Sequence, residues 1–139
     1  LEMGCVSMSR AFFRSGKLSK KNWEKAGIAA LTEAQADTAR MKAIYNERRV
    51  FMIRRLREMG LGITVEPTGA FYVFANARHI SNDSYALAFD ILEKARVGVT
   101  PGIDFGPNAE GYLRFSYANS LENIAAGMDR LERYLTQHG

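Results

Sequence analysis

The chain has 139 residues, of which 47% are hydrophobic and 24% are charged, and its net charge is +4. These values are typical of one globular domain with a single core. No apolar run approaches the roughly 18 residues that a membrane span requires, so we expect no membrane association. A single cysteine, Cys5, excludes an internal disulfide framework, and His79 and His138 lack metal-ligand spacing. We therefore expect a metal-free, cytoplasmic protein.

The positive charge is concentrated at the beginning of the chain. Residues 1–25 carry six basic and two acidic side chains, whereas the rest of the chain carries 13 of each. Residues 1–25 also lack a sustained hydrophobic period. We expect them to be a basic leader, disordered or derived from expression or read-through, ahead of a domain over residues 26–139. An acid-free stretch from Met8 leaves a transit peptide as an alternative.

The basic leader also raises the question of nucleic-acid binding. Affinity for phosphates requires several cations that are organised on one surface, and the remainder of the chain is neutral. We therefore expect no nucleic-acid partner. If the leader did bind nucleic acid, its deletion should abolish the binding.

A long helix is predicted over residues 26–59. This stretch lacks proline and is rich in helix-forming residues, with room for one break. Apolar residues recur along one helical face, which we expect to join the core. They are Met41, Tyr45, Met52, Leu56 and Met59.

Strands and helices alternate in the rest of the chain. Alternating polarity over residues 63–77 predicts a strand that is best developed in its second half. A second helix should begin after Asn82 or Asp83 and extend to about Arg96. A short strand is expected over residues 97–100. The apolar residues expected on the inner side of the second helix are Tyr85, Ala88, Leu92 and Ala95.

A loop, a strand and a final helix complete the chain. Pro101 and Gly102 predict a type II turn, and residues 112–118 predict a strand. Asn119 and Glu122 have the spacing of a capping box, which is followed by an amphipathic helix to the end of the chain. The order of elements predicts an α+β fold, in which helices cover a small sheet of three to four strands.

Arg114 is a candidate functional residue within the strand over residues 112–118. Alternation places Leu113 and Phe115 on one face of this strand and Arg114 on the other. The side chain could simply be a solvated arginine. It could also recognise a carboxylate, because a guanidinium offers a planar fork of donors that matches a carboxylate. Periodicity does not decide between the two.

Four motifs in a fixed order bear on this question. They are GIAAL at 27–31, PTGAFYVF at 67–74, VTPGIDFG at 99–106 and YLRFSYA at 112–118. Together they resemble the C-terminal end of class I/II aminotransferases, the aspartate-aminotransferase-like branch of fold-type-I pyridoxal-phosphate (PLP) enzymes. The resemblance covers residues 26–139.

The resemblance implies a role for several residues. The arginine of the family's LRFSYA-like strand binds the α-carboxylate of the substrate, and here it matches Arg114. The family's GxFY segment lines the same cleft, so Phe71, beside Gly69, would contact substrate or cofactor; alternatively, Phe71 is core. The PGxxFG loop borders the active site in such enzymes, although turn geometry alone could explain its glycines. Its residues here are Pro101, Gly102, Phe105 and Gly106.

No residue of this chain matches the family's lysine that bonds covalently to the cofactor. Transamination requires a lysine that holds PLP as a Schiff base. The family marks this lysine by SK followed by a GxRxG-like stretch, but here only Ser19 and Lys20 echo it, too close to GIAAL. We interpret Lys20 as a chance match. The other cofactor-binding residues of the family lie in a large domain, which has no counterpart in this sequence.

Other catalytic arrangements have less support. Ser116 has no partner histidine near it in sequence, and no nucleophile elbow or P-loop occurs. Asp129 and Glu132 are expected on the solvated side of the last helix.

The sequence therefore predicts the C-terminal substrate-carboxylate-binding domain of a PLP-dependent aminotransferase. The full-length enzyme would transfer an amino group between an amino acid and a 2-oxo acid. This chain alone should be inactive and should not bind PLP. Its expected partners are the missing large domain and further copies of itself in a homo-oligomer. The alternative is a non-catalytic, self-associating interaction module derived from such an enzyme.

Overall fold

The computed structural model describes residues 20–138, which fall into two compact units that meet at residues 46 and 47. The described part of the first unit contains helix α2 (Lys20–Thr32) and the beginning of helix α3 (Gln35–Glu58). The break allowed in the predicted long helix occurs as a turn at residues 33 and 34. Helix α2 begins at Lys20, six residues before the predicted start.

Two expectations concern the first unit. Met41 was expected in the core, but its side chain is 54% exposed, so this expectation is wrong. Residues 1–19 of the expected leader lie outside the described residues, and its division from the domain at residue 25 stays a prediction.

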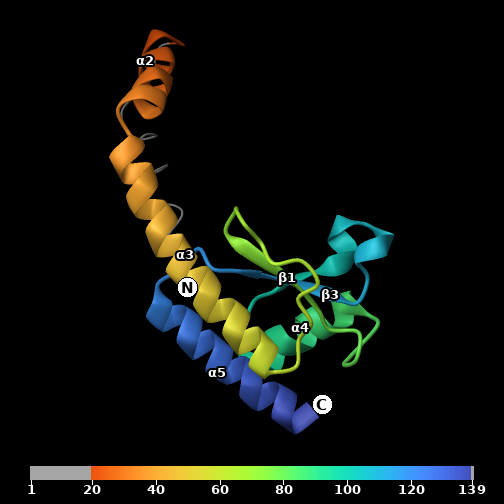
Figure 1. The fold of residues 1–139 in the computed structure, drawn as a ribbon. Coiled ribbons are helices and arrows are strands. Elements are labelled where there is room, and N and C mark those ends of the chain that lie inside the picture. Colours follow the sequence, from red (N-terminus) through yellow and green to blue (C-terminus); the bar gives the residue numbers. More distant parts are fainter. Residues whose placement is uncertain (1–19, 139) are drawn as a thin grey trace. The chain divides into compact units, whose positions relative to one another are not determined.

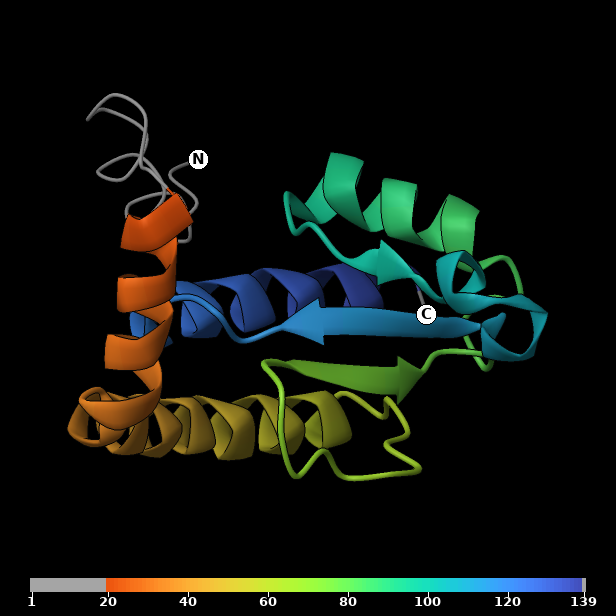
Figure 2. The ribbon, with the colours of Figure 1, turned by 90° about the horizontal axis from the view of Figure 1, so that it is seen from above.

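The second unit, residues 47–138, is built on an antiparallel sheet in the order β1-β3-β2. Its strands are β1 (Tyr72–Asn76), β2 (Thr100–Pro101) and β3 (Tyr112–Ser116). Figure 2 shows β1 and β3 side by side and running in opposite directions. The predicted α+β fold with a small sheet is confirmed. The strand expected over residues 97–100 is reduced to the short β2, which begins at its last residue.

Helices cover one face of this sheet. They are α4 (Ser84–Ala95), α5 (Leu121–His138) and the part of α3 that follows residue 46, which lies beside α5 (Figure 1). Strands β1 and β3 contribute four buried side chains to the core, one from every second position: Val73, Ala75, Leu113 and Phe115. The helices contribute Met52, Leu56, Ile91, Met128 and Leu131. The other face of the sheet carries no α-helix of this unit among the described residues.

Arg55 joins α3 to α5 through two carboxylates. Its guanidinium lies 2.8 Å from Asp129 and 3.1 Å from Glu132. The hydrogen bond from Arg55 to Asp129 raises the pKa of this guanidinium, which is only 15% exposed. Asp129 and Glu132 are exposed, as expected, but they serve to fix one helix against another.

Helix α4 is rotated relative to the prediction. Asp83 caps it, because its carboxylate accepts a hydrogen bond from the Ala86 amide at 2.8 Å. However, Tyr85 and Leu92 are 56% and 47% exposed, so their expected inner position is wrong. Apolar residues occur on both sides of this helix, so periodicity alone could not choose the buried side. The buried apolar residues are Leu87, Ala88, Ile91 and Ala95.

The cap of α5 also differs from the prediction by one residue. The Ser120 hydroxyl accepts a hydrogen bond from the Asn123 amide at 3.2 Å, as an N-cap does. Asn119 instead accepts hydrogen bonds from the Ser120 amide and the Asn123 side chain. The predicted capping box between Asn119 and Glu122 is therefore wrong, although the helix it announced is present.

Neither a membrane-spanning helix nor a metal-binding group occurs in the described part of the chain. No helix within residues 20–138 has the length and apolar character needed to cross a bilayer. In the same part of the chain, no group of histidine, cysteine, aspartate or glutamate side chains is arranged to hold a metal ion.

Candidate functional site

The open face of the sheet, opposite the helices, presents Arg114. In β3, Leu113 and Phe115 are buried against the helices and Arg114 lies between them in sequence, so its side chain is directed the other way. The register places Phe74 of β1 and Thr100 of β2 on either side of Arg114. Three strands therefore converge on one guanidinium.

Two aromatic rings and one hydroxyl hold this guanidinium. The Arg114 Cζ atom lies 5.2 Å from the centre of the Tyr72 ring and 4.8 Å from that of Phe105. Cations bind to aromatic faces at such distances. The Arg114 Nη2 atom also donates a hydrogen bond to Thr100 Oγ1 at 3.3 Å. We call Arg114, Tyr72, Phe105 and Thr100 the arginine clamp.

No carboxylate neutralises Arg114 among the described residues, since no ion pair of this side chain occurs there. Most other arginines of the second unit are paired with acids or backbone carbonyls: Arg49 and Arg57 contact Glu66, and Arg55 contacts α5. The guanidinium of Arg114 is half-buried and has donors to spare. It is thus arranged to receive an anion from outside the sheet.

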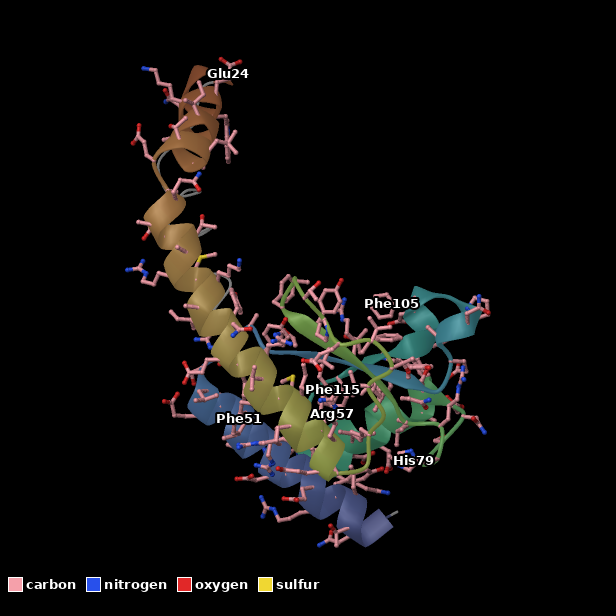
Figure 3. All side chains as sticks on the ribbon, in the orientation of Figure 1. Glu24, Phe51, Arg57, His79, Phe105 and Phe115 are labelled. Carbon is pink, nitrogen blue, oxygen red and sulfur yellow. The ribbon has the colours of Figure 1, made fainter. Side chains whose placement is uncertain are left out.

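Phe105 is itself fixed by a row of rings. Phe74 meets Phe105 edge-on, with 5.7 Å between ring centres, and stacks on Tyr112 at 5.2 Å. Arg78 covers the other end of the row, with its Cζ atom 5.1 Å from the centre of the Tyr112 ring. In Figure 3, Phe105 lies above the sheet and Phe115 lies toward the helices. The row gives the arginine clamp a rigid wall.

Phe71 and Gly69 lie at the edge of the same face. The Phe71 side chain is 48% exposed and meets Tyr72 edge-to-face at 5.5 Å, so it is not part of the core. Tyr117 fixes the backbone here, because its amide donates to the Phe71 carbonyl at 2.8 Å and its hydroxyl to the Gly69 carbonyl at 3.4 Å. The structure thus brings Phe71 next to the arginine clamp through Tyr72.

The loop after β2 differs from the predicted type II turn. Gly102 does not have the positive φ that such a turn needs; it starts a 3₁₀ helix, Gly102–Phe105. A Cβ atom at Gly102 would lie 2.0 Å from the Ala109 carbonyl oxygen, so glycine is required here by close packing of backbone. Positive φ occurs instead at Gly106, where φ is 106°. Both glycines position Phe105 against Arg114.

Glu110 ties this loop to α4. Its carboxylate accepts hydrogen bonds from the Ser84 amide at 2.7 Å and from the Gly111 amide at 2.9 Å. The Ser84 hydroxyl in turn accepts a hydrogen bond from the Ile103 amide at 3.1 Å. The Ser84 hydroxyl, followed by the Ser84 and Gly111 amides, lowers the pKa of Glu110 below its ordinary value of 4.5. The ionised carboxylate therefore stabilises the loop.

We expect this carboxylate to make stability depend on pH. Because its pKa is lower in the folded chain, its contribution is present above the unfolded pKa and is lost as the pH falls through the folded pKa. Urea unfolding at about pH 6 and about pH 3 should show a smaller loss of stability for Glu110→Gln than for the parent chain. An equal loss in both proteins would contradict the assignment. Glu93→Gln, which changes an exposed carboxylate on α4, is the control.

Sequence reasoning missed three residues of the site. Tyr72 could have been found, since it shares the period of two with Phe74 on the exposed side of β1. Thr100 and Glu110 had no local signal, because their partners lie 14 and 26 residues away in sequence.

Comparisons with known proteins identify relatives of this chain. The model of a family described as aminotransferase class I and II matches residues 11–131, so the match begins within the expected leader. An aspartate aminotransferase of Pyrococcus horikoshii is 47% identical over 113 residues, covering 79% of this chain and 29% of that protein. A probable N-acetyl-LL-diaminopimelate aminotransferase of Bacillus subtilis is 36% identical, covering 81% of this chain and 28% of that protein.

Solved structures show the same likeness. The crystal structure of an aromatic aminotransferase from Pyrococcus horikoshii matches with a TM-score of 0.70 at 36% identity, over 86% of this chain and 28% of that one. An aminotransferase of Mycobacterium tuberculosis matches with a TM-score of 0.72 at 30% identity, over 81% of this chain and 30% of that one. The chain thus spans less than a third of the length of these relatives.

Proposed function

Because this chain belongs to the class I and II aminotransferase family, we propose that it is the C-terminal domain that binds the substrate carboxylate in a PLP-dependent aminotransferase. The full-length protein would transfer an amino group between an amino acid and a 2-oxo acid in the cytoplasm. The observation that carries this proposal is the arginine clamp: a half-buried guanidinium, held between two rings, with no acid partner among the described residues.

The arginine clamp would orient the substrate. A carboxylate can accept two parallel hydrogen bonds from one guanidinium, which fixes its plane as well as its position. Tyr72 and Phe105 restrict the rotation of Arg114, and the bond to Thr100 occupies one nitrogen and leaves the remaining donors for the ligand. Such positioning contributes to the rate of a reaction, because the reactants no longer have to find the geometry by chance.

The clamp does not itself fit PLP. This cofactor supplies the electron sink for amino-group transfer and requires a lysine that forms a Schiff base with it. None of the described side chains that contact Arg114 is a lysine or an acid; they are Tyr72, Phe105 and Thr100. The side chain of Lys20 lies outside the described residues. We therefore propose that the cofactor is held by the large domain and that this chain alone is inactive.

Two measurements on this chain test the proposal. A titration with 2-oxoglutarate, followed by NMR of the arginine Nε–H groups, should shift the Arg114 signal in a saturable way. Incubation with PLP and borohydride, followed by peptide mapping, should give no specific adduct. If the carboxylate shifted the NMR signals of other arginines only, the arginine clamp would be refuted. A specific PLP adduct at Lys20 would refute the proposal that the large domain holds the cofactor.

Self-association is a second candidate function, supported by a different surface. Three apolar side chains at helical spacing on α4 are about half exposed: Tyr85, Phe89 and Leu92. Exposed apolar patches of this kind mark interaction sites. A homo-oligomer or a non-catalytic interaction module would use this surface. Sedimentation velocity over a range of concentrations distinguishes a monomer from an oligomer, and Phe89→Ser should shift the equilibrium toward monomer.

A further inference from the structure

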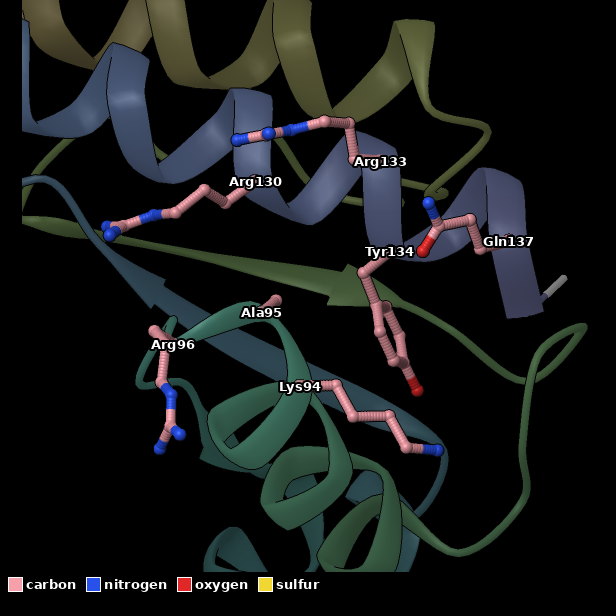
Figure 4. Close-up of a pocket in the computed structure, with 7 residues that line it drawn as sticks. All are labelled: Lys94, Ala95, Arg96, Arg130, Arg133, Tyr134 and Gln137. Atoms are coloured by element: carbon pink, nitrogen blue, oxygen red, sulfur yellow. The ribbon is translucent and has the colours of Figure 1, made fainter.

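A second basic region lies away from the arginine clamp and shares no residue with it. A pocket of about 280 Å³ lies between the C-terminal end of α4 and the middle and end of α5 (Figure 4). Four of the seven residues that line it are cationic: Lys94, Arg96, Arg130 and Arg133. The other three are Ala95, Tyr134 and Gln137. The pocket therefore concentrates positive charge in a concave surface.

Three acids of α4 and α5 are already engaged, namely Asp90, Asp129 and Glu132. Lys94 pairs with Asp90 at 2.8 Å, and the same carboxylate accepts a hydrogen bond from Tyr134 at 2.5 Å. On α5, Asp129 and Glu132 pair with Arg55 of α3. Within residues 20–138, Arg96 and Arg130 form no hydrogen bond or ion pair with another side chain or with the backbone. Two guanidinium groups thus lack a counter-charge at the pocket.

Tyr134 contributes a neutral wall to this pocket. Burial, followed by the hydrogen bond to Asp90, raises the pKa of its hydroxyl to about 12. The hydroxyl therefore stays protonated at neutral pH and adds no negative charge. Arg133 donates to the backbone carbonyl of Asp129 at 3.3 Å, and no carboxylate within residues 20–138 forms an ion pair with it.

The backbone at Arg96 gives an independent observation. Arg96 ends α4 in the left-handed conformation, with φ 56° and ψ 37°. Glycine is the residue that favours this position after a helix, because a Cβ atom is disfavoured there. Arginine occupies it nonetheless, and Arg96 is one of the residues that line the pocket. Helix termination alone would not select this residue.

We propose that this pocket binds a small polyanion that carries phosphoryl or carboxylate groups, with Arg96 and Arg130 as its principal ligands. Guanidinium groups match both kinds of anion through paired N–H donors. The volume of about 280 Å³ lies just below the range for ligand pockets, about 300 to 1,000 Å³, which favours a compact anion over a nucleotide. This site is separate from the arginine clamp and does not depend on the proposed transamination.

Calorimetric titration of this chain with pyrophosphate and with citrate, at constant ionic strength, tests the proposal and separates the two anion classes. We expect saturable binding of at least one of them. The Arg96→Gln/Arg130→Gln variant should weaken it at least tenfold. Arg40→Gln/Lys42→Gln removes the same charge from exposed positions outside the pocket and should leave it unchanged. Absence of saturable binding, or equal weakening in both variants, would overturn the proposal.

Arg96→Gly separates ligand binding from folding. Glycine relieves the left-handed backbone, so this variant should melt at a higher temperature than the parent while binding the probe more weakly. A variant that melts higher and binds equally well would overturn the role of Arg96. Arg114→Gln should retain the binding of pyrophosphate, which has no carboxylate; its loss in this variant alone would assign the binding to the arginine clamp and refute the pocket.

Discussion

Replacing Gly102 with alanine should lower the free energy of unfolding by about 3 kcal/mol, at the upper end of the cost of overpacking. The added Cβ atom would lie 2.0 Å from the Ala109 carbonyl oxygen and 2.6 Å from that of Tyr112. Both atoms belong to the backbone, so neither can rotate away as a side chain would. The loop must therefore move, and with it Phe105. Urea unfolding measures the change in stability.

Gly98→Ala is the matched control for this substitution. A Cβ atom at Gly98 would meet nothing within 4 Å, and Gly98 does not have positive φ. We expect its free energy of unfolding to change by less than about 0.5 kcal/mol. A similar effect of both substitutions would show that close backbone packing at Gly102 is not what requires glycine there.

Replacing Arg114 with glutamine should weaken carboxylate binding by about 10- to 100-fold, because a hydrogen bond to a charged group contributes roughly 1.5 to 3 kcal/mol. Arg114→Lys should restore only part of the affinity. Lysine keeps the charge, but it lacks the planar fork and the flat face that packs between Tyr72 and Phe105. Calorimetric titration with 2-oxoglutarate gives the affinities of the three proteins, because the two variants have no Arg114 Nε–H signal to follow.

Arg54→Gln serves as the control, since it removes one exposed positive charge of α3 that lies outside the arginine clamp. Its affinity for 2-oxoglutarate should equal that of the parent chain. Full affinity in Arg114→Lys would mean that charge alone attracts the carboxylate and that the rings do not position the guanidinium. Unchanged affinity in Arg114→Gln would remove Arg114 from the site altogether.

The side of the sheet on which Arg114 lies could be predicted because strand alternation has a period of two and the apolar residues of β3 leave no ambiguity. Leu113 and Phe115 are buried, and Arg114 is on the opposite face as expected. The inner side of α4 could not be predicted in the same way. Its apolar residues surround most of the helix, and the choice depends on Ser84, which is buried and bonded to residues more than 15 positions away.

The loop after β2 illustrates a second limit. Pro101 and Gly102 have the composition of a type II turn, but the chain folds back so that backbone atoms of residues 109 and 112 approach Gly102. Composition reports the local conformational preference of a residue, whereas the space around it depends on distant parts of the chain. Thr100, one partner of Arg114, was missed for the same reason, since it is aligned with Arg114 only through the pairing of β2 with β3.

The pairing of Arg114 with Phe74 and Thr100 has a consequence for how this chain can vary. An insertion or deletion of one residue that slid β3 by one position would turn every side chain of the strand over. Arg114 would then enter the apolar interior, while Leu113 and Phe115 would face water. A change of register would therefore disrupt the arginine clamp and the apolar core together. Variation in the length of the preceding loop is tolerated only where it leaves β3 in place.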